Sequence, residues 1–320
     1  MLRTMNRRTL LRASLGAAGL SAGFLGALIA PRAQAKAART PVQSTKLADD
    51  LYLFQGTGGN VVAASSADGL LLVDGGSAER SSELLKRVTS ETGQRRVQQL
   101  VNTHWHWDHT GSNEALAKSG ANILAHENTK LWLGAEVISK WEGRTYPPRP
   151  ARALPTQTFF YDADAKPLSF GGQALEYSVM PGAHTDGDIY VFFPRQNVLV
   201  AGGVVSGGEY PIADYCTGGW LGGMISGLKV LLSKTDANTR IVPGSGALRT
   251  RADLEAQLDL CFTTLSKIGE SYYKGQTWDE LVASRPTRDF DARWGNPDTF
   301  LRVAYEGAWH HINEIRRVTR

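Results

Sequence analysis

Apolar residues recur along the chain in short runs that predict β-strands separated by glycine-containing turns. In the first half these runs lie at residues 51–55, 60–65, 69–74, 97–102 and 122–126, and in the second half at 158–161, 174–180, 189–193, 198–201 and 240–242. Apolar residues at helical spacing separate several strands, at 77–92, 111–118 and 221–232. Strands interleaved with helices predict an α/β fold, a four-layer αββα sandwich of two mixed β-sheets with helices on both outer faces.

The last third of the chain is predicted to be helical. Thr250 and Thr277 each precede an acidic residue three positions later and then an apolar periodic run, which is the signature of a helix N-terminus. The segment 146–155 holds four prolines and is predicted to be a loop. We expect residues 47–320 to form a single domain with a helical C-terminal extension.

Residues 1–35 are predicted to be a twin-arginine-type signal peptide. Arg7 and Arg8 precede a small, apolar run at 13–30, and Ala33-Gln34-Ala35 offers the small residues of a cleavage site. Cleavage after Ala35 leaves a polar linker at 36–46, and an uncleaved N-terminal anchor is the alternative. We expect recognition by the twin-arginine export machinery and a periplasmic or secreted protein with no stable membrane span in its mature form.

The basic net charge belongs to this N-terminal segment. Residues 1–35 contain five arginines and no acidic residue, so their removal lowers the formal net charge from +4 to −1. A nearly neutral mature chain gives no support to a nucleic-acid partner, which requires a basic surface against the phosphates. The expected partner is a small-molecule substrate.

Two cysteines cannot supply a disulfide framework, even in an oxidising compartment. Cys261 falls on an apolar helical stripe, where a small buried hydrophobe is expected. Cys216 falls in a predicted loop, and a single bridge between the two is the alternative.

The most informative local sequence follows the apolar run that ends at Val101. It reads Asn102-Thr103-His104-Trp105-His106-Trp107-Asp108-His109, so three of the seven histidines fall within six residues. In extended backbone His104 and His106 point to the same side, which lets two imidazoles bind one ion. Asp108 and His109 follow at the turn into the next helix. His184, in a glycine-flanked turn after a later strand, is the candidate third imidazole.

This pattern resembles that of the metallo-β-lactamase superfamily over nearly the whole mature chain, from about Leu51 to about Arg293. Asp74, in Val73-Asp74-Gly75-Gly76, matches the first motif of that family, a structural carboxylate near the metal loop. The second motif is matched by His104, His106, Asp108 and His109, and the third by His184. The resemblance implies the same fold and a metal-dependent hydrolase, similar to exported zinc hydrolases of broad specificity.

Two positions depart from the family pattern. Gly203 stands where members usually carry a metal-bridging Asp or a Cys, and Ser245 stands where the last motif usually has a histidine. Neither replaces the missing ligand, because glycine has no side chain and a neutral hydroxyl binds zinc poorly. Restoring both residues, Gly203→Asp with Ser245→His, is expected to raise the metal content toward two ions per chain.

The remaining ligands predict one zinc ion per chain. His104, His106 and His184 with a water form the three-protein-ligand set of an open catalytic zinc site. Asp108 and His109 are left as weak ligands of a second site or as proton-handling groups. Glu209, Asp214 and Cys216 lie on a later loop, where they complete the second site or serve as ordinary loop residues.

The leading hypothesis is hydrolysis by a metal-bound hydroxide of a small ester, thioester, lactone or β-lactam type substrate. Asp108 and His109 are the candidate catalytic residues, because each can orient or deprotonate a water. One alternative is a degenerate, non-catalytic metal- or ligand-binding periplasmic member of the same fold, and another is a mononuclear redox centre. Trp105 and Trp107 either wall the site or belong to the core. Arginines 144, 149 and 152 bind an anionic group or lie in solvent.

Overall fold

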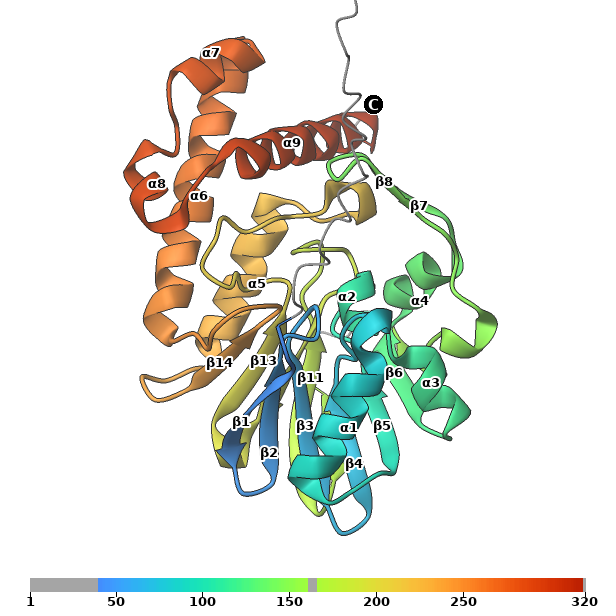
Figure 1. Cartoon of the computed structure of the whole chain (residues 1–320). Helices are drawn as coiled ribbons and strands as arrows, with labels where there is room; N and C mark the ends of the chain where they lie inside the picture. The colour runs from blue at the N-terminus through green and yellow to red at the C-terminus, as the bar shows by residue number, and fades with distance from the viewer. Residues whose placement is uncertain (1–39, 161–165, 319–320) are drawn as a thin grey trace, which may run out of the picture. The chain divides into compact units, whose positions relative to one another are not determined.

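The structure, a computed structural model, describes residues 40–160 and 166–318. Two β-sheets pack against each other at its centre (Figure 1). The larger sheet has seven strands, in the spatial order β1 (Gln43–Ala48), β2 (Leu51–Gln55), β3 (Val61–Ser66), β4 (Gly69–Val73), β5 (Val97–Val101), β6 (Asn122–His126) and β9 (Gln157–Phe159). The smaller sheet has five, in the order β10 (Lys166–Phe170), β11 (Gln173–Val179), β12 (Ile189–Phe193), β13 (Val198–Gly202) and β14 (Arg240–Pro243). Both sheets mix parallel and antiparallel pairs.

Helices cover the outer face of each sheet. The seven-stranded sheet is covered by α1 (Ser81–Thr92) and α3 (Asn113–Lys118), and the five-stranded sheet by α5 (Leu221–Ser233) and α6 (Arg251–Tyr273). The remaining helices are α2 (Trp107–Thr110), α4 (Glu127–Gly134), α7 (Trp278–Ala283), α8 (Arg288–Trp294) and α9 (Asp298–Val318). The predicted four-layer αββα sandwich is therefore confirmed.

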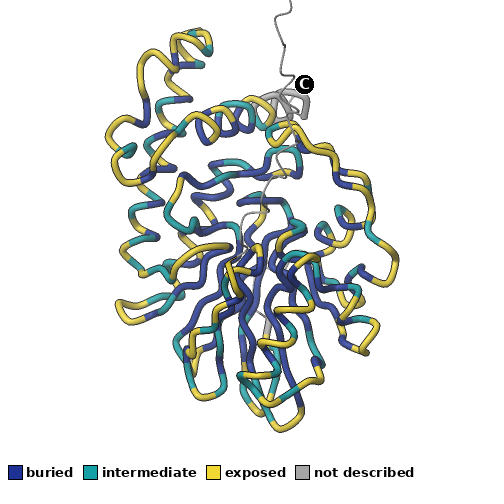
Figure 2. The backbone as a smooth tube through the Cα atoms, in the orientation of Figure 1, coloured by how far each residue is buried: buried dark blue, intermediate teal, exposed yellow. Residues whose placement is uncertain are grey.

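Three buried apolar clusters correspond to the three interfaces between the four layers. Because side chains alternate along a strand, Leu71 and Val73 of β4 pack between the sheets while Leu70 and Leu72 pack under the helices. Strands buried on both faces have no position that requires a polar residue, which is why their sequences are continuously apolar. Figure 2 shows these central strands as the buried part of the molecule.

The last third of the chain is helical, and helices α6 and α7 begin where the capping residues indicated. The Thr250 and Thr277 hydroxyls each accept a hydrogen bond from the backbone N–H three residues later, and the Asp253 and Glu280 carboxylates accept one from the backbone N–H of the capping threonine. Helix α9 contacts α5, α6 and the 3-10 turn η4 (Tyr215–Thr217). These C-terminal helices thus cover the outer face of the smaller sheet and the loop after β13 that contains η4 (Figure 1).

The structure also contains elements that the sequence pattern did not indicate. Strand β1 begins at Gln43, inside the segment expected to be a linker, and pairs with β2. Helix α4 and the hairpin of β7 (Val137–Ser139) and β8 (Arg144–Tyr146) lie between β6 and β9. The short α4 and the three-residue strands of this hairpin are too brief to show clear periodicity. The predicted signal peptide, at residues 1–35, lies outside the described residues.

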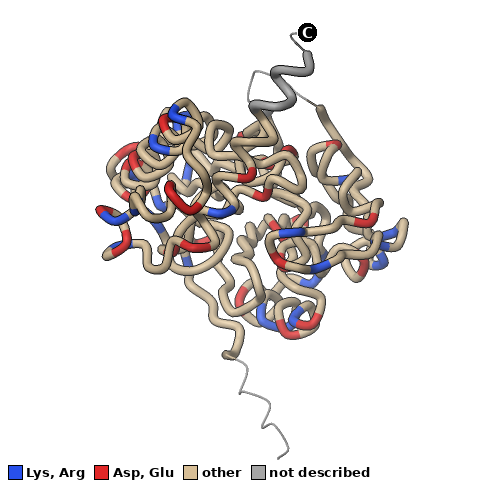
Figure 3. The backbone as a smooth tube through the Cα atoms, turned by 90° about the horizontal axis from the view of Figure 1, so that it is seen from above, with Lys and Arg blue, Asp and Glu red and all other residues tan. Residues whose placement is uncertain are grey.

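Within the described ranges, no helix combines the length and the apolar character needed to cross a membrane. Lysines and arginines alternate with aspartates and glutamates around the periphery of the same part of the chain (Figure 3). Cys216 and Cys261 are both unpaired, which excludes the single bridge left open above. Cys261 is fully buried among apolar residues, as its place on the helical stripe predicted.

Candidate metal centre

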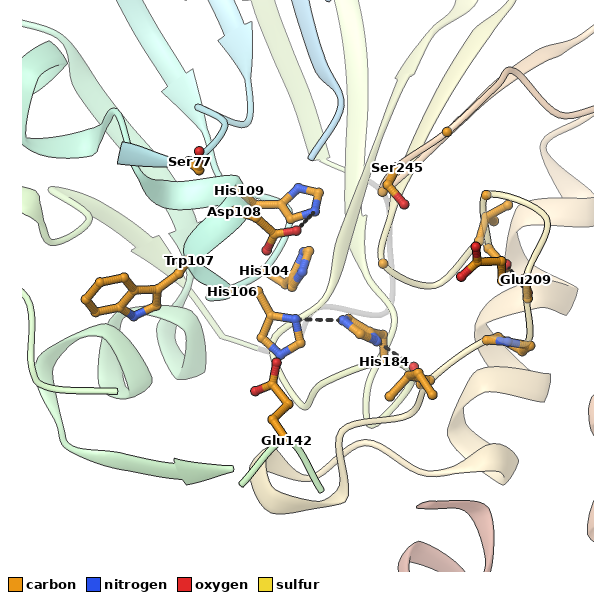
Figure 4. A pocket seen from close by; sticks show the side chains of 18 of the residues that line it. Ser77, His104, His106, Trp107, Asp108, His109, Glu142, His184, Glu209 and Ser245 are labelled. Carbon is orange, nitrogen blue, oxygen red and sulfur yellow. Dashed lines mark hydrogen bonds and ion pairs between the residues drawn. The ribbon is translucent and has the colours of Figure 1, made fainter. Parts of the chain in front are cut away.

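The loops that follow β4, β5, β11, β13 and β14 line one cavity of about 590 Å³. All five residues proposed from the sequence lie on its wall: His104, His106, Asp108, His109 and His184. Figure 4 shows the first four on one side of the cavity and His184 facing them from the other. The fold therefore brings together side chains that are up to 80 residues apart in the sequence.

A buried carboxylate organises the first loop. Asp74, the residue after β4, has the left-handed φ of 65°, which its short polar side chain tolerates better than most. Its carboxylate accepts hydrogen bonds from the Thr103 backbone N–H at 2.8 Å, from Thr103 Oγ1 at 2.8 Å and from His109 Nδ1 at 2.8 Å. Asp74 thus connects the two ends of the histidine motif, as the family resemblance implied.

Three imidazoles converge in the cavity. One ring nitrogen from each of His104, His106 and His184 lies within 4.8 Å of those of the other two. The nearest pair is His184 Nε2 and His106 Nδ1, which are 3.0 Å apart (Figure 4). His104 and His184 are buried and His106 is half-buried.

The opposite nitrogen of each ring has an acceptor, which fixes the tautomer. His184 Nδ1 donates to the Ile212 carbonyl at 2.6 Å, and His106 Nε2 donates to Asp214 Oδ2 at 3.1 Å. The Thr103 hydroxyl donates its one hydrogen to Asp74. It therefore accepts a hydrogen bond from His104 Nδ1, which lies 2.9 Å from Thr103 Oγ1. His104 Nε2, His106 Nδ1 and His184 Nε2 therefore all present lone pairs to the cavity.

Burial favours the neutral form of His104 and of His184. It lowers the pKa of His104 well below the usual range, and the neighbouring histidines lower it further. Burial also lowers the pKa of His184, to about 3, with His106 contributing in the same direction. The lone pairs of His184 and His106 that face one another at 3.0 Å repel unless a cation lies between them, and the low pKa of His184 disfavours a proton there. The donor set fits a metal ion that prefers imidazole nitrogen.

Asp108 and His109 form a separate pair at the edge of the triad. The Asp108 carboxylate is exposed in the cavity, and its Oδ2 lies 3.7 Å from His109 Nε2. Burial alone would lower the pKa of His109, but Asp108 and Asp74 outweigh it and raise the pKa to about 9. The two carboxylates therefore favour the protonated form of His109.

Gly203 and Ser245 both line the cavity. A Cβ built on Gly203 would lie 2.2 Å from His184 Cδ2 and 2.6 Å from its Nε2, so this backbone position has no room for a side chain while His184 keeps its place. Ser245 is exposed at the cavity wall. Gly203 therefore lies against a ring of the triad, and Ser245 lies on the wall of the same cavity.

The three loop residues considered as extra ligands separate in the structure. Asp214 is fully buried and supports His106 from behind, instead of facing the cavity. Glu209 lines the cavity, on the opposite side from Asp108 and His109 (Figure 4). Cys216 Sγ accepts a hydrogen bond from the Lys140 backbone N–H at 3.4 Å.

The two tryptophans of the motif have different surroundings. Trp105 is buried and donates from Nε1 to Thr217 Oγ1 at 3.0 Å, so it belongs to the core. Trp107 lines the cavity, and the Arg149 guanidinium lies 3.7 Å from the centre of its ring. Arg144 also lines the cavity, whereas Arg152 is exposed in the following segment.

Sequence reasoning missed several residues of the site. Asp188 accepts hydrogen bonds from the backbone N–H groups of His184 and Thr185, and it thereby shapes the turn that carries the third histidine. Because Asp188 lies only four residues after His184, its place in the same turn could have indicated this supporting role from the sequence. Trp141 and Glu142 reach the cavity from the β7–β8 hairpin, and no local motif marks them.

The fold and the three-histidine centre are those of a metal-dependent hydrolase. The family comparison identifies the group: the model of the metallo-β-lactamase superfamily matches residues 55–259, so the chain belongs to the metallo-β-lactamase superfamily. This confirms the resemblance inferred from the motifs.

The relatives are distant. Two proteins named metallo-β-lactamase type 2 are similar over 201 residues, covering 63% of this chain and 72% of theirs: one from Bacillus sp. (strain 170) at 26% identity and one from Bacillus cereus at 23%. A solved metallo-β-lactamase from Pontibacter korlensis has a TM-score of 0.56 at 22% identity, over 69% of this chain and 99% of its own. The crystal structure of the metallo-β-lactamase DIM-1 has a TM-score of 0.54 at 18% identity, over 70% and 98%.

Proposed function

We propose that the protein is a hydrolase that uses one zinc ion, held by His104, His106 and His184, to cleave a small ester, thioester, lactone or β-lactam type substrate. One observation carries the proposal. Three ring nitrogens with lone pairs converge within 4.8 Å, and each ring is fixed from behind by its own acceptor. When bound, zinc would supply Lewis-acid chemistry that lowers the pKa of a water ligand to about 7.

Asp108 would act as the proton-handling group. Its carboxylate is exposed in the cavity and can accept a hydrogen bond or a proton from a water there. Partial removal from bulk water inside the cavity would by itself raise the pKa of Asp108, but His109 and His106 lower it below the usual range. A depressed pKa keeps the carboxylate ionised and makes it a weaker base.

His109 would keep Asp108 ionised and oriented. Its Nδ1 is fixed by Asp74 at 2.8 Å, which directs Nε2 toward the Asp108 carboxylate. The protonated ring can return a proton to a leaving group once the bond has broken. The pair thus offers one acceptor and one donor beside the triad.

The cavity wall is suited to a small organic substrate. A volume of about 590 Å³ lies within the range of ordinary small-molecule sites. Trp107 and Tyr146 supply aromatic surface, and Arg144 can pair with a carboxylate on the substrate. The acidic residues Glu142 and Glu209 also line the cavity, so substrates with several negative charges are disfavoured.

The test combines metal analysis with a hydrolysis panel of ester, thioester, lactone and β-lactam substrates. Purified protein should contain about one zinc per chain and cleave at least one class, and His106→Ala should abolish both. His310→Ala is the matched control, because His310 is exposed on α9. A protein that binds zinc through the triad but cleaves nothing would support the non-catalytic alternative.

Export of the chain is a separate proposal. We infer that residues 1–35 direct twin-arginine export, supported by Arg7 and Arg8 before the apolar run. Replacing both arginines by lysine should retain the protein in the cytoplasm. Unchanged appearance in the periplasm would contradict this role.

A further inference from the structure

The support behind the metal ligand His106 is a buried carboxylate with four donors. Asp214 Oδ2 accepts from His106 Nε2 at 3.1 Å and from Thr217 Oγ1 at 2.8 Å. Its Oδ1 accepts from the Trp141 indole N–H at 2.9 Å and from the Cys216 backbone N–H at 3.1 Å. Each oxygen therefore has two donors, which holds the plane of the carboxylate in one orientation.

The Trp141 donor comes from a distant part of the chain. Thr217 and Cys216 belong to the same turn, η4, as Asp214, and they cannot anchor that turn to another element. Trp141 lies 73 residues earlier, at the tip of the β7–β8 hairpin. The tip makes a second contact with η4, where the Lys140 N–H donates to Cys216 Sγ at 3.4 Å.

The base of the same hairpin packs on the histidine motif. Tyr146, at the end of β8, is buried, and its ring centre lies 5.4 Å from that of Trp105 and 5.5 Å from that of Trp107. These two tryptophans flank His106 in the sequence. The hairpin is thus fixed at its base to the loop that carries His106 and at its tip to the carboxylate that orients His106.

We propose that Trp141 is a positioning residue for the metal ligand His106. Its N–H fixes Asp214, Asp214 fixes the Nε2–H tautomer of His106, and Nδ1 is thereby directed toward His104 and His184. The inference rests on the proposed function, because it assumes that the triad holds the metal. The positioning role of Trp141 makes the β7–β8 hairpin part of the metal centre. The same hairpin carries Glu142 and Arg144 on the cavity wall, so one segment would affect both metal affinity and substrate contacts.

Trp132 provides a matched control. Its indole N–H also donates to a carboxylate, Asp186 Oδ1 at 2.7 Å, but neither residue lines the cavity. Trp141→Phe and Trp132→Phe each remove one indole–carboxylate hydrogen bond and keep an aromatic ring. The affinity for zinc, measured on the whole protein by competition with a chelator, should fall about tenfold for Trp141→Phe and stay within about twofold of wild type for Trp132→Phe.

A double-mutant cycle tests whether Trp141 acts through Asp214. Asp214→Asn should weaken zinc binding at least as much as Trp141→Phe, and adding Trp141→Phe to Asp214→Asn should cause little further loss. Thermal unfolding of all the variants without zinc separates a folding defect from a binding defect. Comparable midpoints for the two tryptophan variants, with zinc affinity lost only in Trp141→Phe, support the positioning role.

Two results would overturn it. Wild-type zinc affinity in Trp141→Phe, or simple additivity of the two losses in the cycle, removes the positioning role and leaves the triad intact. Zinc binding that is unchanged in His104→Ala shows instead that the triad does not hold the metal. That second result removes the proposed function and the positioning role together.

Discussion

Hydrogen-bond partners decide the role of each histidine in the site. The outer nitrogen of each convergent ring donates to an acceptor: His104 to Thr103, His106 to Asp214 and His184 to the Ile212 carbonyl. The inner nitrogens therefore direct lone pairs into the cavity. His109 differs, because carboxylates lie beside both of its nitrogens. The four rings share a cavity, yet three suit a metal ligand and one suits a cation.

Gly203→Ala is expected to weaken zinc binding at least tenfold, because the added Cβ would lie 2.2 Å from His184 Cδ2 and displace the ring. The sequence suggested that Gly203→Asp with Ser245→His raises the metal content, and the structure predicts a loss. Chelator competition measures the affinity, with Ser245→Ala as the control at an exposed position. A Gly203→Ala protein that binds zinc as tightly as wild type would show that His184 moves freely.

Asp186 predicts a pH dependence of stability. Burial raises its pKa to about 6, from an ordinary value of 3.8, so the ionised form opposes folding. The loss of folding stability caused by the ionised carboxylate is absent below about pH 3.8, grows as the pH rises and is complete above about pH 6. Asp186→Asn, which keeps an acceptor for Trp132, should therefore gain more stability over wild type at pH 7 than at pH 4.5. Urea unfolding at both values measures this, and an equal gain at both contradicts the burial of a charge.

Some residues of the candidate site could be predicted from the sequence and others could not. The candidate ligands could be predicted because His104 and His106 lie within one histidine-rich loop and His184 lies in a glycine-flanked turn. Asp214 and Trp141 could not, because a hydrogen bond between residues 73 positions apart leaves no local pattern.

Among the elements, strands and helices with strong signals were predicted closely. Strands β2, β6 and β12 have the predicted bounds, since each is an apolar run bounded by turn residues. Strand β1 was missed because its side chains are mostly exposed or half-buried at the edge of the sheet. The β7–β8 hairpin was missed because three-residue strands carry almost no periodicity.

Thr250→Ala is expected to lower the free energy of unfolding by about 1 kcal/mol, because Thr250 caps the 23-residue helix α6. Zinc affinity should not change, since the cap lies outside the cavity wall. Thr263→Ala, in the interior of the same helix, is the control and should cost less. Chemical unfolding checks both, and equal costs would show that the capping box does not stabilise α6.

At the scale of the whole molecule, the two-sheet sandwich explains how distant residues form one centre. The apolar strands can be buried on both faces only if helices cover both sheets, and this packing brings the loops after β5 and β11 to one cavity. The pattern of apolar and polar positions along the chain was sufficient to predict these four layers. The pairing order of the strands and the docking of the hairpin depend on tertiary contacts that patterning does not encode.

We propose above that the centre holds one metal ion through three histidines, His104, His106 and His184. Native mass spectrometry after equilibration with excess zinc measures it directly, on wild type and on His184→Ala. We expect one zinc per wild-type chain, none in the variant, and loss of hydrolysis together with the metal. Two zinc ions per wild-type chain, or one retained in His184→Ala, would contradict it.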